Sequence, residues 1–580
     1  MTTPLLDQLV SEIVVDGEPF EEALDREARQ LLLDSRSDSL TPILDELTVL
    51  DLTDRPYAQL LVGMVAHASV PKHPEVTDQM LDAAEATLAQ RGEAAGEALA
   101  SWVRGNVCLA FGDLPGAAHA WQRAVELDPA SDMVEDLSLA NLAYGSFCVN
   151  GDLTAALVLA EAAITSSRER EHGRGEGLGL VYDGYLRMHA GQFEQAEQSF
   201  ALADKAFAAE SPAPYEWPLA FAGRGALAGM RGQADRADEA FLDAILLARQ
   251  MDNIWLEAIV RTLRADHTLR HDSRRAHADC RFAQRVFDQL GDTWWASTAR
   301  RVRADAALAS GEIEAARLLT EKLLPVLDNP VERARCLITA GKAHLRAGDE
   351  DAATAAADEA VQLVEHTGAD YILVQALFLV AQCEPWRAPE AIERARALSS
   401  EDAAYLELWA SRPTLRLLVL GRQSVRVGDN EVTFRTSRAE HLVMMLALAG
   451  GRAVDVRVVA EALWPGARSD KLPSNLSTAT YDARQALGSE AWRLHRAGTQ
   501  FWLDLDGAFV DLDEATRRAR GIRPLHEAEP ADKAAAEAGR RAAVDDLRRE
   551  ILPTLVFEPW VRDANLRRQS FLELLDAGPT

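Results

Sequence analysis

Small and apolar residues recur at helical spacing along the first 400 residues, in a pattern that repeats every 37 to 41 residues. Each repeat has a turn residue, then Ala five positions later, a variable core residue at nine, and Ala or Leu at twelve. These spacings place three positions on one stripe of a helix. The repeats start at Gly112, Gly151, Gly191, Gly232, His271, Gly311, Gly348 and, in weaker form, Trp386.

The repeated unit is predicted to be a pair of helices. Glycine allows the tight turn between the two helices, and alanine lets neighbouring helices approach closely. Residues 111–129 (FGDLPGAAHAWQRAVELDP) resemble the tetratricopeptide repeat, including the Asp-Pro that closes its second helix. The period of about 40 exceeds the usual 34 residues, as in the extended helical repeats of large bacterial transcription activators. The sequence therefore predicts a mainly α protein, with a helical cap at 1–54 and a superhelical repeat array at 55–412.

Arrays of this kind bind peptides, helices or occasionally small effectors on a concave face. Several tryptophans in the array either line such a pocket or pack between repeats. Packing is the commoner role of tryptophans at helical spacing. They are Trp102, Trp217, Trp255, Trp294 and Trp295.

The pattern changes at Pro413, where alternating short apolar runs predict strands at 415–420, 424–427 and 431–434, with a hairpin turn at 428–430. Three helices follow. The first starts at the cap Ser437 and ends at 449, the second runs from the cap Asp455 to Trp464, and the third opens at Pro473 and ends at Leu487. Residues 493–505 then predict a β-hairpin. The region 413–515 is therefore predicted to be an α+β domain.

Strands, three helices and a hairpin in this order resemble the OmpR/PhoB-type winged helix, and most closely its SARP branch. The resemblance is carried by LRLLVLG (415–421), ALWPG (462–466), SNLSTATYDARQALG (474–488), RAGTQFWLDL (496–505) and VDLDEA (510–515). Residues 549–575 resemble the first helices of the bacterial transcriptional activator domain, particularly at Glu558-Pro559-Trp560-Val561. Residues 516–580 are therefore expected to form a helical tail of that type.

The resemblance implies that the third helix reads DNA. Leu476, Thr480, Ala483 and Leu487 share a core-facing stripe, which leaves the other side of the helix outward. The family usually has Arg-Leu-Arg-Arg where this chain has 482–485, Asp-Ala-Arg-Gln. An outward Asp482 would repel phosphate, or accept from cytosine N4 if a base lay opposite it. The outward residues are expected to be Asn475, Thr478, Tyr481, Asp482 and Gln485, with Arg484 at the edge.

Further candidate contacts surround this helix, at the entry to the first helix, in the loop before the third, and on the wing. Each basic residue among them is equally well explained as an ordinary solvated charge. Trp502 stands on a wing strand where the family often has a basic residue, so packing is expected there. The candidate DNA-binding residues are Arg435, Arg438, Arg468, Lys471, Ser474, Asn475, Thr478, Tyr481, Asp482, Arg484, Arg493, Arg496 and Thr499.

The net charge of −30 is unevenly distributed. Residues 414–515 carry 12 basic and 13 acidic side chains and residues 516–580 carry 12 and 11, so the whole excess of acid lies in residues 1–413. Such a surface repels nucleic acid and favours protein partners, or it simply keeps a large protein soluble. The near-neutral C-terminal region predicts a weak counterion-release contribution to any DNA affinity.

Other functional classes have little support in the sequence. Nucleotide-binding, hydrolase and metalloprotease motifs are missing, so we expect no catalytic residues, no cofactor and no metal. The five cysteines lie far apart and are expected to be reduced core residues of a cytoplasmic protein. The longest apolar runs are too short to span a membrane, and the acidic N-terminus lacks the basic start of a signal peptide.

Two functional hypotheses follow. In the first, the chain is a non-enzymatic transcription regulator: the winged helix binds double-stranded promoter DNA, with a homodimer on DNA as one arrangement, and the array binds a protein or effector partner. In the second, the winged helix is degenerate and the protein is a scaffold in protein–protein interaction. The acidic array is expected to restrain the winged helix, either by long-range repulsion or because the last repeats cover the third helix.

Overall fold

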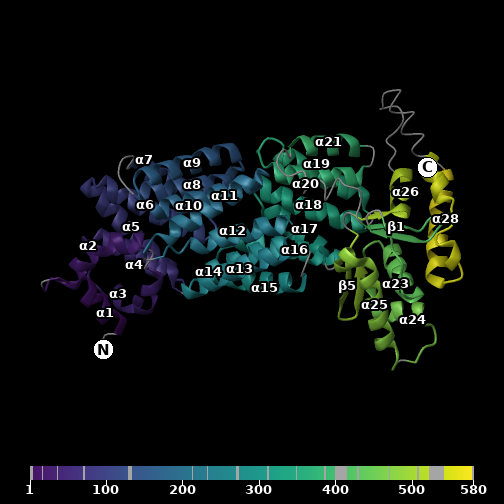
Figure 1. The fold of residues 1–580 in the computed structure, drawn as a ribbon. Coiled ribbons are helices and arrows are strands. Elements are labelled where there is room, and N and C mark those ends of the chain that lie inside the picture. Colours follow the sequence, from purple (N-terminus) through teal and green to yellow (C-terminus); the bar gives the residue numbers. More distant parts are fainter. Residues whose placement is uncertain are drawn as a thin grey trace. The chain divides into compact units, whose positions relative to one another are not determined.

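A computed structural model gives the fold (Figure 1). It describes residues 4–577 apart from 16, 35–36, 70–71, 128–132, 212, 232, 270–272, 310–311, 348, 385–386, 399–414, 428–429, 469, 506–507 and 521–540. Several sequence expectations concern residues outside this described set. They are the repeat starts Gly232, His271, Gly311, Gly348 and Trp386, the Asp128-Pro129 pair, the boundary at Pro413, and the turn residues Gly428 and Asp429.

The chain divides into two compact units. The first contains Met1–Arg303 together with two short later segments, Pro325–Arg333 and Leu363–Tyr371. The second contains Ala304–Leu324, Ala334–Gln362 and Ile372–Thr580.

The N-terminal region is helical, as expected for a cap. Its apolar residues, from Leu9 onward, belong to a hydrophobic core that continues into the first repeats. Proline occupies the first turn of α4 and of α5, where a missing N–H costs nothing. The helices are α1 (Pro4–Ile13), α2 (Phe20–Leu33), α3 (Leu44–Thr48), α4 (Pro56–Ala68) and α5 (Pro74–Arg91).

The predicted repeats are helix pairs (Figure 1). All the template positions at five, nine and twelve residues are buried except Leu398, which confirms the sequence pattern. The pairs are α6 (Ala94–Ala110) with α7 (Leu114–Leu127), α8 (Met133–Asn150) with α9 (Leu153–Glu169), α10 (Gly173–His189) with α11 (Phe193–Ala208), and α12 (Trp217–Met230) with α13 (Ala234–Gln250). They continue with α14 (Ile254–Thr268) and α15 (Ser273–Leu290), α16 (Thr293–Ala309) and α17 (Ile313–Leu323), α18 (Pro330–Ala347) and α19 (Glu350–Val364), and α20 (Asp370–Cys383) and α21 (Ala388–Leu398).

The elements from β1 to α28 form what we call the C-terminal module. Its helices are α23 (Ser437–Leu448), α24 (Val456–Leu463), α25 (Leu472–Leu487), α26 (Asp511–Arg520) and α28 (Pro559–Ala577). One sheet has the order β3-β2-β1-β7 and the other β4-β6-β5. The strands are β1 (Leu415–Leu418), β2 (Ser424–Val427), β3 (Asn430–Glu431), β4 (Val454–Asp455), β5 (Leu494–Ala497), β6 (Gln500–Leu503) and β7 (Phe509–Val510).

The order of strands, three helices and a hairpin is consistent with the predicted winged helix. β1 pairs antiparallel with β2 and parallel with β7, and β5 pairs antiparallel with β6 so that His495 lies opposite Trp502. One predicted cap is wrong: Thr436, not Ser437, accepts the N–H of Ala439 and caps α23. Asp455 caps α24 as expected, because its carboxylate accepts the N–H of Arg457 at 2.7 Å.

The C-terminal tail shares the hydrophobic core of the module. Ile551, Leu552 and Val561 are fully buried in the same cluster as Leu415. The backbone N–H of Leu552 donates to the carbonyl of Val419 at 2.8 Å. These tail residues therefore help to hold β1 in place.

Candidate nucleic-acid interface

The outer face of α25 carries hydroxyl groups. The stripe of Leu476, Thr480, Ala483 and Leu487 is buried as predicted. On the other side Ser474, Thr478 and Tyr481 are exposed, with Tyr481 at 60%. Asn475 is half-buried. The exposed side of the helix therefore offers hydroxyl groups, which can both donate and accept hydrogen bonds, beside the exposed Arg484 and Gln485.

Asp482 does not lie on that face, so the expectation of an outward, phosphate-repelling acid is wrong. Its side chain is 4% exposed and accepts a hydrogen bond from the Thr436 hydroxyl at 3.2 Å. Because Thr436 also caps α23, the carboxylate joins the start of α23 to the middle of α25. Asp482 therefore serves to pack the two helices together.

Two arginines expected at the interface make hydrogen bonds within the module, Arg484 while remaining exposed and Arg493 while buried. Arg484 donates from Nε and Nη2 to the carbonyl of Leu494, at 3.2 and 2.8 Å. Arg493 is 5% exposed, pairs with Glu490 at 2.6 Å and donates to the carbonyl of Asp504. Arg493 is thus excluded from the surface of the wing, since the hairpin strand begins one residue later, at Leu494. Arg484 fixes α25 to that strand.

The remaining candidate cations lie at the surface around α25. The Arg435 and Arg468 side chains are 81% and 80% exposed, the first 3.9 Å from Asp482 and the second paired with Asp470 at 3.2 Å. Lys471 is exposed and Arg438 half-buried. Arg496 is exposed on β5, with its guanidinium 5.2 Å from the centre of the Phe501 ring.

The wing tip is joined to the start of α24. Thr499 is exposed, and its carbonyl accepts the N–H of Val456 at 2.7 Å. This bond places Arg496 near the first turns of α24 and α25, where both line one groove.

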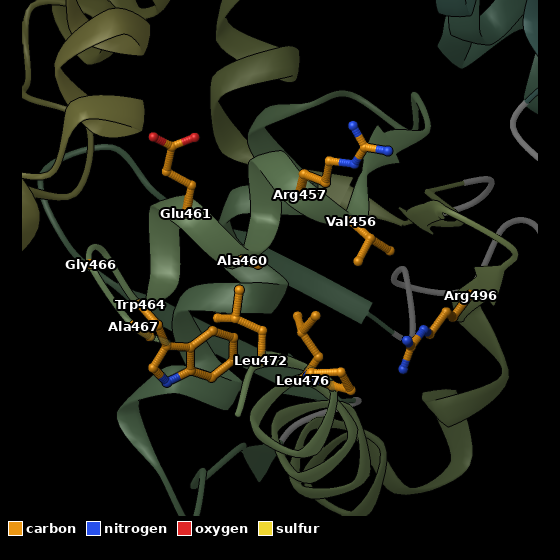
Figure 2. Close-up of a pocket in the computed structure, with 11 residues that line it drawn as sticks. Val456, Arg457, Ala460, Glu461, Trp464, Gly466, Ala467, Leu472, Leu476 and Arg496 are labelled. Atoms are coloured by element: carbon orange, nitrogen blue, oxygen red, sulfur yellow. The ribbon is translucent and has the colours of Figure 1, made fainter. Parts of the chain in front are cut away.

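The groove, about 390 Å³ in volume, lies between α24, the following loop and the start of α25 (Figure 2). Trp464 and Arg496 stand at opposite ends of it in this view. Its lining is largely apolar, and sequence reasoning did not identify it because its residues come from three separate segments. The lining residues are Val456, Arg457, Ala460, Glu461, Trp464, Gly466, Ala467, Leu472, Pro473, Leu476 and Arg496.

The β5–β6 hairpin also packs against the repeats of the second unit. Trp502 is 4% exposed, lies parallel to His495 with 4.9 Å between ring centres, and donates from its indole N–H to the carbonyl of Ala309 at 3.1 Å. Arg346 pairs with Asp504 at 3.4 Å and donates to the carbonyl of Leu308. Packing by Trp502, expected from the sequence, is confirmed.

This contact involves the hairpin and leaves the hydroxyl-bearing face of α25 exposed. Burial lowers the pKa of His495; the charges of Arg484 and Arg346 lower it further, and that of Asp504 opposes them. The imidazole is therefore kept neutral at pH 7 between α25 and the repeats. Among the described residues of the second unit, the last repeats do not cover the outer face of the third helix, contrary to expectation.

Metal sites and membrane-spanning helices are the two other kinds of feature that bear on function in the described part of the chain. No group of His, Cys, Asp or Glu there has the arrangement needed to hold a metal ion. Among the described helices, none combines the length and the apolar character needed to cross a membrane. The five cysteines are free thiols; Cys108 is half-buried and the other four are buried.

No family model matches this sequence, and no curated protein matches it. Solved structures with a similar fold include a Rap protein complexed with competence and sporulation factor, at 15% identity over 63% of this chain and 99% of that chain, with a TM-score of 0.41. The Cut9–Hcn1 complex of APC/C is 13% identical over 70% and 72% of the two chains, with a TM-score of 0.44. A tetratricopeptide repeat protein from Parabacteroides merdae is 18% identical over 48% and 98%, with a TM-score of 0.29.

Proposed function

We propose that this protein is a non-enzymatic regulatory adaptor whose repeat array binds a protein or peptide partner. The support is the run of stacked helix pairs, in which buried alanines let the helices approach closely and leave long rows of side chains on the helix faces. The acidic excess of residues 1–413 favours a partner with a basic surface.

For the C-terminal module we propose binding to double-stranded DNA through the outer face of α25. One observation supports this most: the face is exposed, carries Ser474, Thr478 and Tyr481, and is free of the acid that the sequence placed there. Hydroxyl groups can contact phosphates and base edges alike. The exposed cations Arg435, Lys471 and Arg496 stand around the face and would meet phosphates.

The electrostatic part of such binding would be small. Arg484 and Arg493 are engaged within the module, which leaves few cations for the DNA backbone. We expect only about 3–5 neutralised phosphates, so affinity should depend weakly on salt.

A second candidate function is that of a protein–protein adaptor without DNA binding, and the groove beside α25 favours it. An apolar floor of Ala460, Leu472 and Leu476 could receive a partner's apolar side chain, with Trp464 and Arg496 at its ends. The same module would then act as a docking platform.

Genome-wide recovery of DNA bound to the tagged intact protein separates the two candidates. DNA binding predicts enrichment of one short motif, lost in a Thr478→Ala/Tyr481→Ala variant and kept in Ala467→Glu, which changes only the exposed groove wall. A motif made of two copies would indicate a dimer on DNA. If no motif is enriched, and co-purifying proteins are lost in Ala467→Glu, the adaptor function is the correct one.

A further inference from the structure

Three contacts within the first unit join early repeats to late ones. At each contact, the end of the first helix of one repeat meets the start of the first helix of a repeat about 180 residues later. The pairs of helices are α6 with α16, α8 with α18, and α10 with α20. The bonds from Thr293 to Phe111 and from Asn329 to Phe147 both span 182 residues. Gly191 and Tyr371, which meet in the third contact, are 180 residues apart. We call these contacts the three junctions.

At the first junction the start of α16 meets the end of α6. The Thr293 hydroxyl donates to the carbonyl of Phe111 at 3.3 Å. Lys72 donates to the carbonyl of Ala110 at 3.1 Å, with its ammonium 4.4 Å from the centre of the Phe111 ring. A Cβ on Gly112, whose φ is +78°, would lie 2.7 Å from the backbone nitrogen of Trp294. Only glycine fits this turn.

At the second junction Asn329 makes the main contact. Its side-chain amide donates to the carbonyls of Phe147 and Cys148, at 2.9 and 2.7 Å, near the end of α8. Its side-chain oxygen accepts the N–H of Glu332 at 2.8 Å and so caps α18. A Cβ on Gly151 would lie 2.6 Å from Cγ of Pro330, so this turn too requires glycine.

One backbone hydrogen bond also crosses near the second junction. The N–H of Leu153 donates to the carbonyl of Thr367 at 3.0 Å. Leu153 is the first residue of α9, so its N–H has no acceptor within its own helix. Its protection from exchange therefore depends on the contact between early and late repeats.

The third junction is formed by rings and backbone. Phe193 and Tyr371 meet edge to face, with 5.6 Å between ring centres. The backbone nitrogen of Tyr371 lies 4.0 Å from where a Cβ of Gly191 would stand.

The junctions obey one electrostatic rule. The last carbonyls of a helix lack partners within the helix and carry partial negative charge, whereas the first turn is positive. At each junction, the negative C-terminal end of one helix therefore meets the positive N-terminal end of another. The contacts are a few hydrogen bonds and one ring pair, in place of the close alanine packing between consecutive helices, so we expect the junctions to open at lower cost than the helix pairs.

Near the second junction, α8 and α10 carry two half-buried tyrosines, Tyr144 and Tyr182. Tyr144 and Tyr182 stack with 5.0 Å between ring centres, and the Tyr182 hydroxyl donates to Asn141. Burial raises the pKa of Tyr144 well above its ordinary value, and the charge of Glu332 on α18 adds to the effect. The Tyr144 ring centre lies 6.4 Å from that of Phe147, whose carbonyl accepts the hydrogen bond from Asn329 at the second junction.

We propose that the three junctions are a latch, and that its opening makes the half-buried tyrosines of α8 and α10 more accessible to the basic protein or peptide partner proposed above. The purpose of the latch rests on the proposed partner binding. Its existence does not, because it concerns an equilibrium within this chain between a closed and an open array.

The test is native-state hydrogen exchange on the intact protein, with the Leu153 amide as the reporter. A latch predicts that this amide exchanges through a partial opening, with a much weaker dependence on denaturant than the amides in the middle of α8. Asn329→Ala, which removes two bonds across the second junction, should speed its exchange on the order of tenfold. Hydroxyl-radical labelling of Tyr144 and Tyr182 should rise in the same variant.

Two matched controls separate the latch from general destabilisation. Gly92→Ala places a side chain at an equally left-handed turn, φ +65°, with nothing within 4 Å, whereas Gly151→Ala meets Pro330. Asn253→Ala removes the cap of α14 outside the junctions. Only Gly151→Ala and Asn329→Ala should speed exchange at Leu153.

Three results would overturn the latch. The Leu153 amide could exchange only through global unfolding, with the same denaturant dependence as the centre of α8. Asn329→Ala could leave its exchange unchanged. Exchange could rise while the extent of labelling of Tyr144 and Tyr182 stays the same as in the wild type. A working latch in a protein that binds no partner would instead count against the proposed function alone.

Discussion

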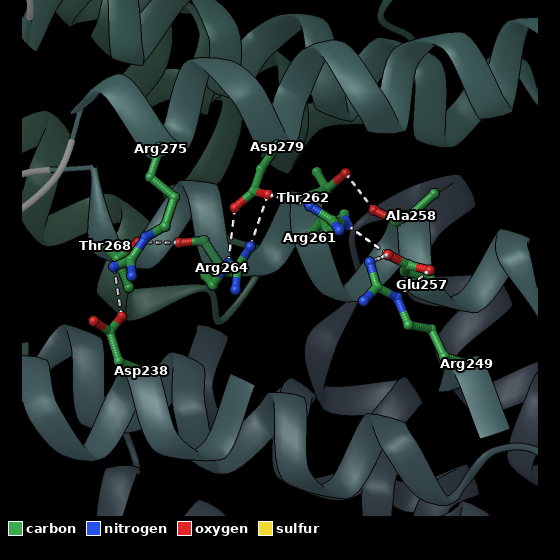
Figure 3. Close-up of polar contacts among 10 residues, drawn as sticks. All are labelled: Asp238, Arg249, Glu257, Ala258, Arg261, Thr262, Arg264, Thr268, Arg275 and Asp279. Atoms are coloured by element: carbon green, nitrogen blue, oxygen red, sulfur yellow. Dashed lines mark hydrogen bonds and ion pairs between the residues drawn. The ribbon is translucent and has the colours of Figure 1, made fainter. Parts of the chain in front are cut away.

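The array and the C-terminal module use their arginines differently. In the array, Arg261 and Arg264 both donate to Asp279, which is 1% exposed, and Arg249 and Arg261 both donate to Glu257 (Figure 3). These acids are balanced by two cations each. In the module, buried Asp482 has a neutral hydroxyl as its hydrogen-bond partner, and Arg484 binds a backbone carbonyl.

This difference shows what a count of charges misses. Some of the array's acids lie inside the helix stack, where arginines pair with them, so these carboxylates are not part of the surface. Such pairs carry no net acid, and the acidic excess of residues 1–413 therefore belongs to the other acidic side chains. The module has almost no net charge, yet with Asp482 buried and Arg493 paired inside, a few exposed cations stand beside the hydroxyl-bearing face of α25. Burial, not net charge, decides which groups can meet a partner.

The largest effect is expected from a buried arginine of the array. Arg301 is 2% exposed and pairs with Asp266 at 2.8 Å and Glu332 at 3.0 Å. Arg301→Met leaves both carboxylates without this cation and should lower the free energy of unfolding by about 3–5 kcal/mol. Thermal denaturation checks it, with Arg468→Met as the exposed control. Equal stability of the two variants would show that array arginines act only as surface charges.

A pH effect of similar size is expected at the first junction. Burial raises the pKa of Asp292 to about 6. Hydrogen bonds from Trp255 and Trp295 and the charge of Lys72 lower this pKa but do not outweigh burial. The pKa of Asp292 is higher in the folded protein than its unfolded value of 3.8. The carboxyl group therefore makes its full contribution to the stability of the fold below pH 4, and this contribution is lost as the pH rises through 6. The free energy of unfolding should fall by roughly 3 kcal/mol over this pH range.

The melting temperature measured between pH 4 and 7 tests this, by comparing the wild type with Asp292→Asn. The variant cannot ionise, so its melting temperature should fall less over this range than that of the wild type. Parallel curves would mean that Asp292 titrates normally.

A smaller effect is expected where the module meets the repeats of its own unit. Trp502→Phe keeps the ring but loses the N–H that donates to Ala309, which leaves a carbonyl unpaired at a cost of about 1–3 kcal/mol. Hydrogen exchange in the β5–β6 hairpin should increase. Trp492→Phe, at a side chain that is 36% exposed, is the matched control and should change nothing.

The smallest effect separates two neighbours in α25. Asp482→Ala removes the acceptor of the Thr436 hydroxyl and should destabilise the protein by about 1 kcal/mol. Tyr481→Ala, one residue earlier and exposed, should leave the melting temperature unchanged. If both variants melt alike, Asp482 does not hold α23 against α25.

Much of the fold could be predicted from the sequence because it depends on local pattern. The alanine template fixed the helix pairs, and the turn residues placed α23, α24 and α25 within a residue or two. The strands β4 and β7 escaped prediction because two residues each are too few to show alternation.

The site was harder to predict, since it depends on contacts between distant segments. Asp482 was expected outward from the stripe of Leu476, Thr480 and Ala483, but α23 covers the neighbouring side of the helix through Thr436. Ala479, 2% exposed, lies in the same wider buried arc. The three junctions could not be predicted either, because a repeat period indicates which consecutive helices pack together. It does not indicate contacts between helices 180 residues apart.

The most direct test of DNA binding through an uncharged face is the salt dependence of affinity. The intact protein would be titrated against a duplex selected from a random pool, across 50 to 300 mM salt, beside the Tyr481→Ala variant. The account predicts binding with a slope of log affinity against log salt that corresponds to about 3–5 phosphates, and loss of sequence preference in the variant. A slope near that of a strongly basic repressor, about 10, or no duplex selected even at low salt, would contradict it.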